Sequence, residues 1–168
     1  KIEEENIHTG GEIGIIDNPK LKSVSGIFPH LEEIDRSLLI RNSGFTSISE
    51  AEFKSLKNIG YDLDITGNAN LKYLDKSFPF LEGLSSLTLR LNPELKKVHG
   101  FCRSLELIEG GDLLIYENIK LESLNDSFTK LSVIDGGNLV VQENAALRSF
   151  GGNGFKSLEE VKEVYGIY

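Results

Sequence analysis

The sequence predicts an all-β protein, a parallel β-helix (solenoid) of about six coils of 24–26 residues. Three observations support this prediction: an asparagine recurs at that interval, the same apolar positions recur around it, and the apolar residues form short strand-like clusters. The recurring asparagines, expected to form a ladder along one corner, are Asn18, Asn42, Asn68, Asn92, Asn118 and Asn144.

A short strand is expected just before each asparagine, because two apolar positions alternate there as on a strand with one buried face. Five residues before the asparagine stand Ile13, Leu63, Leu87, Leu113 and Leu139, with Ser37 as the single exception. Three residues before it stand Ile15, Leu39, Ile65, Leu89, Ile115 and Val141. These side chains are expected to face the interior.

A second strand is expected after each asparagine, at two further apolar columns. Three residues after the asparagine stand Leu21, Phe45, Leu71, Leu95, Leu121 and Leu147. Six residues after it stand Val24, Ile48, Leu74, Val98, Leu124 and Phe150.

A phenylalanine column and a third strand complete the coil. The phenylalanines are Phe28, Phe53, Phe78, Phe101, Phe128 and Phe155. The third strand carries Leu31, Leu56, Leu81, Leu105, Leu131 and Leu158, followed by Ile34, Ile59, Leu84, Ile108, Ile134 and Val161. Glycine pairs such as Gly110-Gly111 and Gly136-Gly137 precede the next first strand and supply turn backbone.

Stacking explains why the coils repeat. A coil of about 25 residues cannot bury its own apolar face, but identical coils paired in parallel at about 4.8 Å can bury it continuously. An asparagine at the same corner of every coil can bond the turn backbone and the neighbouring coils, which satisfies polar groups that would otherwise be buried unpaired. We therefore assign the asparagines a structural role.

The composition excludes several classes of protein. The chain has 168 residues, a formal net charge of −8, 39% hydrophobic residues and a single cysteine, Cys102. The acidic balance argues against nucleic-acid binding, and no apolar run is long enough to span a membrane. One cysteine excludes an internal disulfide framework, and Cys102 is expected to be a small residue of the core.

The repeat resembles that of receptor L domains, which occur in the insulin-receptor and EGF-receptor ectodomains and in fungal, protist and bacterial surface proteins. The similarity lies in the order of glycines, strand residues, asparagine and leucine in residues 110–121 and 136–147. It implies a short right-handed β-helix related to leucine-rich repeats. Because animal receptor L domains carry disulfides, the resemblance is to the cysteine-poor surface proteins. A conventional leucine-rich repeat fits less well, because its leucine comes two residues after the asparagine instead of three.

The chain is expected to form a single solenoid domain over residues 1–168. Residues 1–11 match the close of a repeat and are interpreted as the tail of a preceding coil. Residues 162–168 are interpreted as the start of a further coil or as a cap, because solenoids need protected ends.

Function is expected on outward positions, since the inward ones form the core. On the first strand, four and two residues before the asparagine, apolar side chains gather toward both ends around a polar middle, a pattern typical of an interaction surface. The residues predicted to bind a partner there are Leu38, Ile40, Thr66, Arg90, Tyr116 and Gln142.

The other two strands differ in charge. The second strand is basic-leaning, with Lys22, Lys72, Lys96 and Arg148 beside Ser47, Tyr73, Lys97 and Ser123. The third strand is acidic-leaning, with Glu32, Glu82, Glu106 and Glu159. We interpret both as solvated faces, while an electrostatic role in orienting a partner is the alternative.

Catalytic and metal-binding signals are weak. Glu117 and Glu143 are expected at one corner, one coil apart, which is the only candidate carboxylate pair for a glycosidase-like site. His8, His30 and His99 stand at unrelated repeat positions, so no metal site and no cofactor are expected. Asn125-Asp126-Ser127 is an N-glycosylation sequon, which makes Asn125 the candidate for modification.

The sequence thus predicts a non-enzymatic binding or adhesion domain of a secreted or cell-surface protein. Its partner would be a protein, a glycan or another copy of the chain, without nucleic acid or membrane insertion. A carbohydrate-active β-helix enzyme centred on Glu117 and Glu143, or a purely structural spacer, are the alternatives.

Overall fold

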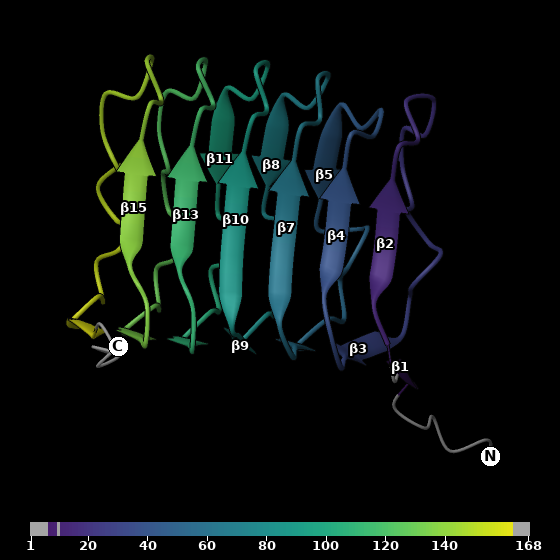
Figure 1. The fold of residues 1–168 in the computed structure, drawn as a ribbon, viewed down its shortest axis with the longest axis horizontal. Helices are drawn as coiled ribbons and strands as arrows, with labels where there is room; N and C mark the ends of the chain where they lie inside the picture. The colour runs from purple at the N-terminus through teal and green to yellow at the C-terminus, as the bar shows by residue number, and fades with distance from the viewer. Residues whose placement is uncertain (1–6, 10, 163–168) are drawn as a thin grey trace, which may run out of the picture.

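The protein is a parallel β-solenoid, as its sequence predicts (Figure 1). The structure, a computed structural model, describes residues 7–9 and 11–162. All regular structure in these ranges is β-strand. Each coil rises along the front sheet of Figure 1, crosses the top and returns behind it while the chain advances from right to left, which makes the solenoid right-handed.

Three parallel sheets form the sides of the solenoid. The six-stranded sheet contains the first strand of each coil: β2 (Ile13–Ile16), β4 (Leu38–Arg41), β7 (Asp62–Thr66), β10 (Ser86–Arg90), β13 (Leu113–Tyr116) and β15 (Leu139–Gln142). The three-stranded sheet contains the second strand of the middle coils: β5 (Ser47–Ser49), β8 (Tyr73–Asp75) and β11 (Lys97–His99). Isolated bridges through Ser123 and Ser149 continue it.

The third sheet has seven strands and closes each coil. Its members are β1 (Ile7–Thr9), β3 (Leu31–Ile34), β6 (Asn58–Ile59), β9 (Gly83–Leu84), β12 (Leu107–Glu109), β14 (Val133–Asp135) and β16 (Glu160–Lys162). Within the segment interpreted as the tail of a coil, β1 pairs in parallel with β3. Residues 1–6, 10 and 163–168 lie outside the described residues, and so does nearly all of the segment interpreted as a further coil or cap.

Most residues of the predicted apolar columns form one continuous core, but Phe150 and Val161 near the C-terminal end are 48% and 45% exposed, so the prediction that these two face the interior is wrong. Strand register places equivalent residues side by side; for example, Leu87 pairs with Leu63 on one side and with Leu113 on the other. The phenylalanine column is a stack of six rings from Phe28 to Phe155, with centroids of neighbouring rings 5.0–5.9 Å apart. Such ring pairs add stabilisation to the burial of the side chains themselves.

Cys102 lies inside this core with no exposed surface, as predicted. Burial raises the pKa of the Cys102 thiol well above its ordinary value, because the thiolate would lose its hydration.

An asparagine ladder holds the corner between the first and second sheets. Asn92 is completely buried, and its Nδ2 donates to the carbonyl oxygens of Arg90 (2.9 Å) and of Ile65 in the preceding coil (3.0 Å). Its Oδ1 accepts the backbone N–H of Asn68 at 3.0 Å. Asn68, Asn118 and Asn144 make the same two bonds to carbonyl groups. The ladder therefore satisfies backbone groups that no water can reach.

The prediction that Asn42 belongs to the ladder is wrong. Ser43 occupies this corner: its backbone N–H donates to Asn68 Oδ1 (3.0 Å), and its Oγ donates to the carbonyls of Ile15 and Arg41. Asn42 stands one position earlier, exposed and with φ of 49°, in a turn row where Gly67 has φ of 69°.

This one-residue shift also corrects the inward positions of the second coil. Leu38 pairs with Ile13 and Leu63, and Ile40 pairs with Ile15 and Ile65. Leu38 and Ile40 are therefore core residues without exposed surface, so the prediction that they face a partner is wrong.

A shortened turn produces the shift. Ile48 pairs with Leu74, as the spacing of the repeat predicts. This coil therefore has one residue fewer between its ladder residue, Ser43, and its second strand than the following coil has between Asn68 and Leu74. The turn runs close to the preceding coil at Gly44, where an added Cβ would lie 2.2 Å from the carbonyl oxygen of Pro19. Only glycine fits at such a distance.

Candidate functional site

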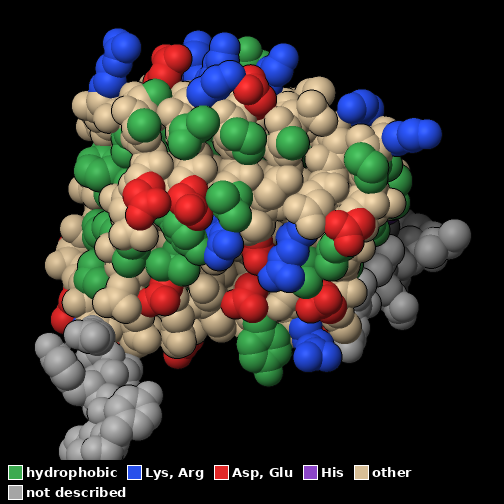
Figure 2. Space-filling model, turned by 45° about the horizontal axis from the view of Figure 1, so that its top comes forward, with side chains coloured by type: hydrophobic (Ala, Val, Ile, Leu, Met, Phe, Trp, Pro, Cys, Tyr) green, Lys and Arg blue, Asp and Glu red, His purple; other side chains and the backbone are tan. Residues whose placement is uncertain are grey.

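Four of the six predicted binding residues do lie on the outer face of the six-stranded sheet. Thr66, Arg90, Tyr116 and Gln142 follow one another across β7, β10, β13 and β15, where the register pairs each with the next. Acidic, basic and apolar side chains are mixed over the face below the upper edge of the view in Figure 2. In the second coil this outward row continues with Arg41, which pairs with Thr66.

The polar side chains of this face bind one another. Arg41 donates to Asp64 from Nε (3.0 Å) and Nη2 (2.5 Å), and the Thr66 hydroxyl also donates to Asp64. Arg90 donates to the Tyr116 hydroxyl at 2.5 Å, and its guanidinium lies 5.1 Å from the centre of that ring. Much of the hydrogen-bonding capacity of this face is therefore already used within the protein.

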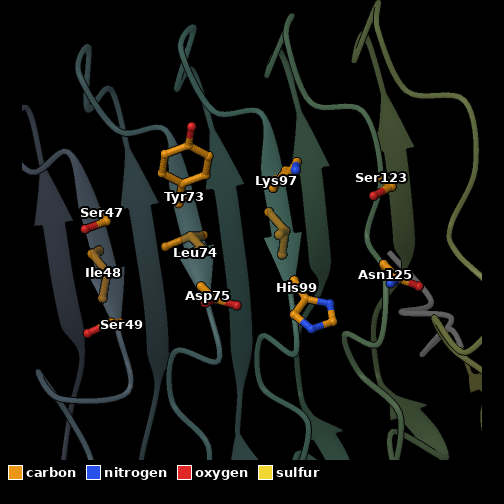
Figure 3. A pocket seen from close by; sticks show the side chains of 11 residues that line it. Ser47, Ile48, Ser49, Tyr73, Leu74, Asp75, Lys97, His99, Ser123 and Asn125 are labelled. Carbon is orange, nitrogen blue, oxygen red and sulfur yellow. The ribbon is translucent and has the colours of Figure 1, made fainter.

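A groove lies on the outer face of the three-stranded sheet (Figure 3). It has a volume of about 640 Å³, within the usual range for ligand sites. Its lining comes from four successive coils and consists of Ser47, Ile48, Ser49, Tyr73, Leu74, Asp75, Lys97, Val98, His99, Ser123 and Asn125.

Strand alternation gives the groove two walls and a floor. One wall is the row Ser47, Tyr73, Lys97 and Ser123, and the other is the row Ser49, Asp75, His99 and Asn125 (Figure 3). Between the walls run Ile48, Leu74 and Val98, whose side chains are buried in the core and whose backbone forms the floor. The groove therefore runs along the solenoid axis, across the strands.

Most polar side chains of the groove have no partner inside the protein. Among the described residues, no hydrogen bond or ion pair engages the side chains of Ser47, Tyr73, Asp75, Lys97, Ser123 and Asn125. Two members of the second wall do have neighbours of this kind: Ser49 Oγ donates to Glu52 at 2.8 Å, and His99 Nδ1 lies 3.7 Å from a carboxylate oxygen of Asp126. This free capacity distinguishes the groove from the outer face of the six-stranded sheet.

A buried carboxylate fixes one end of the groove. Glu52 is only 6% exposed and accepts hydrogen bonds from the backbone N–H and the Oγ of Ser49, at 2.9 and 2.8 Å. Its other oxygen accepts from the Ser23 hydroxyl at 3.1 Å. Glu52 therefore orients Ser49 and joins the groove to the preceding coil.

The glutamates of the enzymatic alternative lie at the corner, away from the groove. Glu117 and Glu143 line one shallow recess together with Leu91, Pro93, Ile119 and Ala145. Both glutamates have positive φ, 57° and 54°, in the same turn row as Asn42. The predicted proximity of the pair is thus present, in a recess of otherwise apolar residues.

No group of three or more His, Cys, Asp or Glu side chains within the described ranges could hold a metal ion. Asn125 of the sequon lines the groove, while the hydroxyl of Ser127 is buried and donates to the Val98 carbonyl. The described part of the chain contains no helix long and apolar enough to cross a membrane.

The charge bias of the second strand is visible in the structure. Lys22, Lys72, Lys96 and Arg148 are all exposed, and Figure 2 shows basic side chains gathered along the upper edge of the molecule. The sequence pattern predicts a solvated face for the neighbouring row with Tyr73 and Lys97, and the structure places this row in the groove. The tyrosine among serines and lysines is the one sequence signal of the groove.

Comparison with known proteins adds no assignment. The chain matches no family model, and neither a curated protein nor a solved structure shows significant similarity to it. The fold therefore defines the class, a parallel β-solenoid, and any function must be argued from the surface of this chain.

Proposed function

We propose that the protein is a non-enzymatic binding domain of the receptor L-domain type, belonging to a secreted or cell-surface protein. Its ligand, a protein segment or a glycan, occupies the groove over β5, β8 and β11. The single observation that carries this proposal is the set of groove side chains without internal partners. The repeat pattern of residues 110–121 and 136–147 supports the assignment to the receptor L-domain type.

Burial and hydrogen bonding favour the groove over the outer face of the six-stranded sheet, which the sequence predicts to bind. Two of the six predicted residues, Leu38 and Ile40, belong to the core, and Thr66, Arg90 and Tyr116 bond within their own face. A ligand there would have to replace existing bonds, which gains little free energy. In the groove, a ligand would displace only water from the polar side chains.

Binding arrays test this proposal. Labelled protein is applied to surfaces printed with oligosaccharides and with peptides, and we expect binding to at least one class. Asp75→Ala should weaken that binding about tenfold. Gln142→Ala, an exposed polar residue of the six-stranded sheet, should leave it unchanged. Binding lost in Gln142→Ala or Arg90→Ala but kept in Asp75→Ala would move the site to that sheet and overturn the proposal.

The enzymatic alternative has its own test, because one observation favours it: Glu117 and Glu143 share a recess. Neutral and acidic polysaccharides are incubated with the protein and the release of reducing ends is measured. We expect none. Release by the wild type that Glu117→Gln abolishes would establish an enzyme and contradict a purely binding function.

A further inference from the structure

We propose that the ligand of the groove is a neutral, linear glycan that runs along the solenoid axis, across the strands. This inference rests on the proposed binding function and narrows its ligand class. Four properties of the groove support it: its dimensions, its floor, the chemistry of its walls and its balance of charge.

The dimensions fit a single extended chain. Residues two apart on a strand lie about 6.6 Å from each other, so this distance separates the two walls. The lining spans four coils, or three intervals of about 4.8 Å, which gives a length of about 14 Å. Because one sugar unit of an extended glycan is about as long as one interval, the groove holds about three to four units.

The floor disfavours an extended peptide. A peptide bound as an added strand needs free backbone N–H and C=O groups at a sheet edge. Here the groove runs over the middle of a sheet, whose strands pair in parallel from β5 through β8 to β11, with bridges on to Ser123. The backbone of β8 is paired on both sides, so a chain lying along the groove finds the N–H and C=O groups at its centre already used, and recognition there must come from the side chains of the walls.

Those side chains are of the kind that bind sugars. Tyr73 is 43% exposed, and in Figure 3 its ring turns a flat face toward the viewer, an apolar surface on which the C–H groups of a pyranose ring can pack. Opposite it are a carboxylate and an amide, Asp75 and Asn125, which can accept from and donate to neighbouring sugar hydroxyls. The serine hydroxyls at Ser47 and Ser123 donate and accept in the same way.

The charges favour a neutral glycan over an acidic one. Lys97 supplies one positive charge on the first wall, and Asp75 supplies one negative charge on the second. The Nδ1 atom of His99 lies 3.7 Å from a carboxylate oxygen of Asp126, beside the second wall. Among the residues that line the groove, an acidic polymer would meet one attraction, from Lys97, and one repulsion, from Asp75, whereas neutral hydroxyls can bond to both groups.

Calorimetric titration with linear neutral oligosaccharides tests the inference. The probes are β-linked glucose and N-acetylglucosamine oligomers, from disaccharide to hexasaccharide. We expect the affinity to rise with length and to level off at about three to four units, the number the groove can hold. A tenfold increase in salt concentration should change Kd less than about twofold, because no net charge is paired.

Matched tyrosine variants locate the binding. Tyr73→Ala should weaken binding about tenfold, while Tyr73→Phe, which keeps the ring, should stay within about twofold. Tyr61→Ala is the control, since Tyr61 is 56% exposed but does not line the groove. Thermal melting verifies that each variant is folded.

Two contrary results are distinguishable. If oligosaccharides fail to bind while a peptide binds and loses affinity in Tyr73→Ala, the glycan assignment is overturned and the groove function stands. If Tyr73→Ala and Asp75→Ala leave the binding of every probe unchanged, both the glycan assignment and the proposed function are overturned.

Discussion

Removal of one ladder asparagine should destabilise the solenoid strongly. In Asn92→Ala, the buried backbone N–H of Asn68 loses its acceptor at 3.0 Å, and the carbonyl of Ile65 loses a donor at 3.0 Å. Each buried polar group left unpaired costs about 1–3 kcal/mol, so for these two groups we expect a loss of about 2–6 kcal/mol in the free energy of unfolding. That is a large fraction of the stability of a typical domain.

Urea denaturation followed by circular dichroism measures this loss. With a slope of about 2 kcal/mol per molar urea, the midpoint should fall by about 1–3 M. Asn42→Gly is the matched control, because Asn42 is an exposed asparagine outside the ladder and its φ of 49° suits glycine. Its free energy of unfolding should change by no more than about 0.5 kcal/mol. Equal shifts in the two variants would refute the ladder reasoning.

Four further outcomes are expected. Phe53→Ala should cost about 3–5 kcal/mol in urea denaturation, because it opens a cavity in the ring stack; a cost below about 1 kcal/mol would contradict the stacking. Gly44→Ala should cost about 2–3 kcal/mol, since its Cβ would overlap the Pro19 carbonyl, and a neutral effect would mean that the turn can move. Glu117→Gly should raise the thermal midpoint, with a gain of about 0.5–1 kcal/mol in the free energy of unfolding, because a glutamate with φ of 57° is strained; a lower midpoint would contradict that strain. Ellman's reagent at pH 8 should not label Cys102 in the folded protein and should label it on unfolding, because burial removes access and raises the thiol pKa; rapid labelling of native protein would contradict that burial.

The sequence predicts the solenoid well because the repeat itself carries the structural information. Each apolar column becomes a core column, since parallel stacking places equivalent residues such as Leu63, Leu87 and Leu113 side by side. Only spacing and residue type are needed for that inference. The same reasoning failed in the second coil, where Asn42 has the expected type and the expected spacing but not the ladder position.

The signs of that failure were in the pattern itself. Ser37 was the one polar residue in an apolar column, and moving the alignment by one residue replaces it with Leu38. Gly44 marks the shortened turn. The shift of the ladder position by one residue is offset by the shorter turn that follows it. The coil length is therefore nearly unchanged, and spacing alone could not reveal the shift.

The candidate site could be predicted only in part, for a physical reason. Whether a polar side chain is free depends on contacts between coils, such as the bond from Arg41 to Asp64, and sequence does not give those distances. From sequence alone, the polar side chains on the outer face of the six-stranded sheet therefore cannot be distinguished from polar side chains that are free to bind a partner. Tyr73 and Asp75 stood in the sequence as an ordinary polar strand, and their shared groove with Asn125 emerges only from stacking.

The most direct test of the proposed function is amide chemical-shift mapping of the ¹⁵N-labelled protein during titration with a linear neutral tetrasaccharide. We predict shifts concentrated on the groove strands and the adjoining turn, at residues 47–49, 73–75, 97–99 and 123–125. Shifts centred on β7, β10 and β13, or at the corner with Glu117 and Glu143, would contradict the account, and so would a spectrum that does not change.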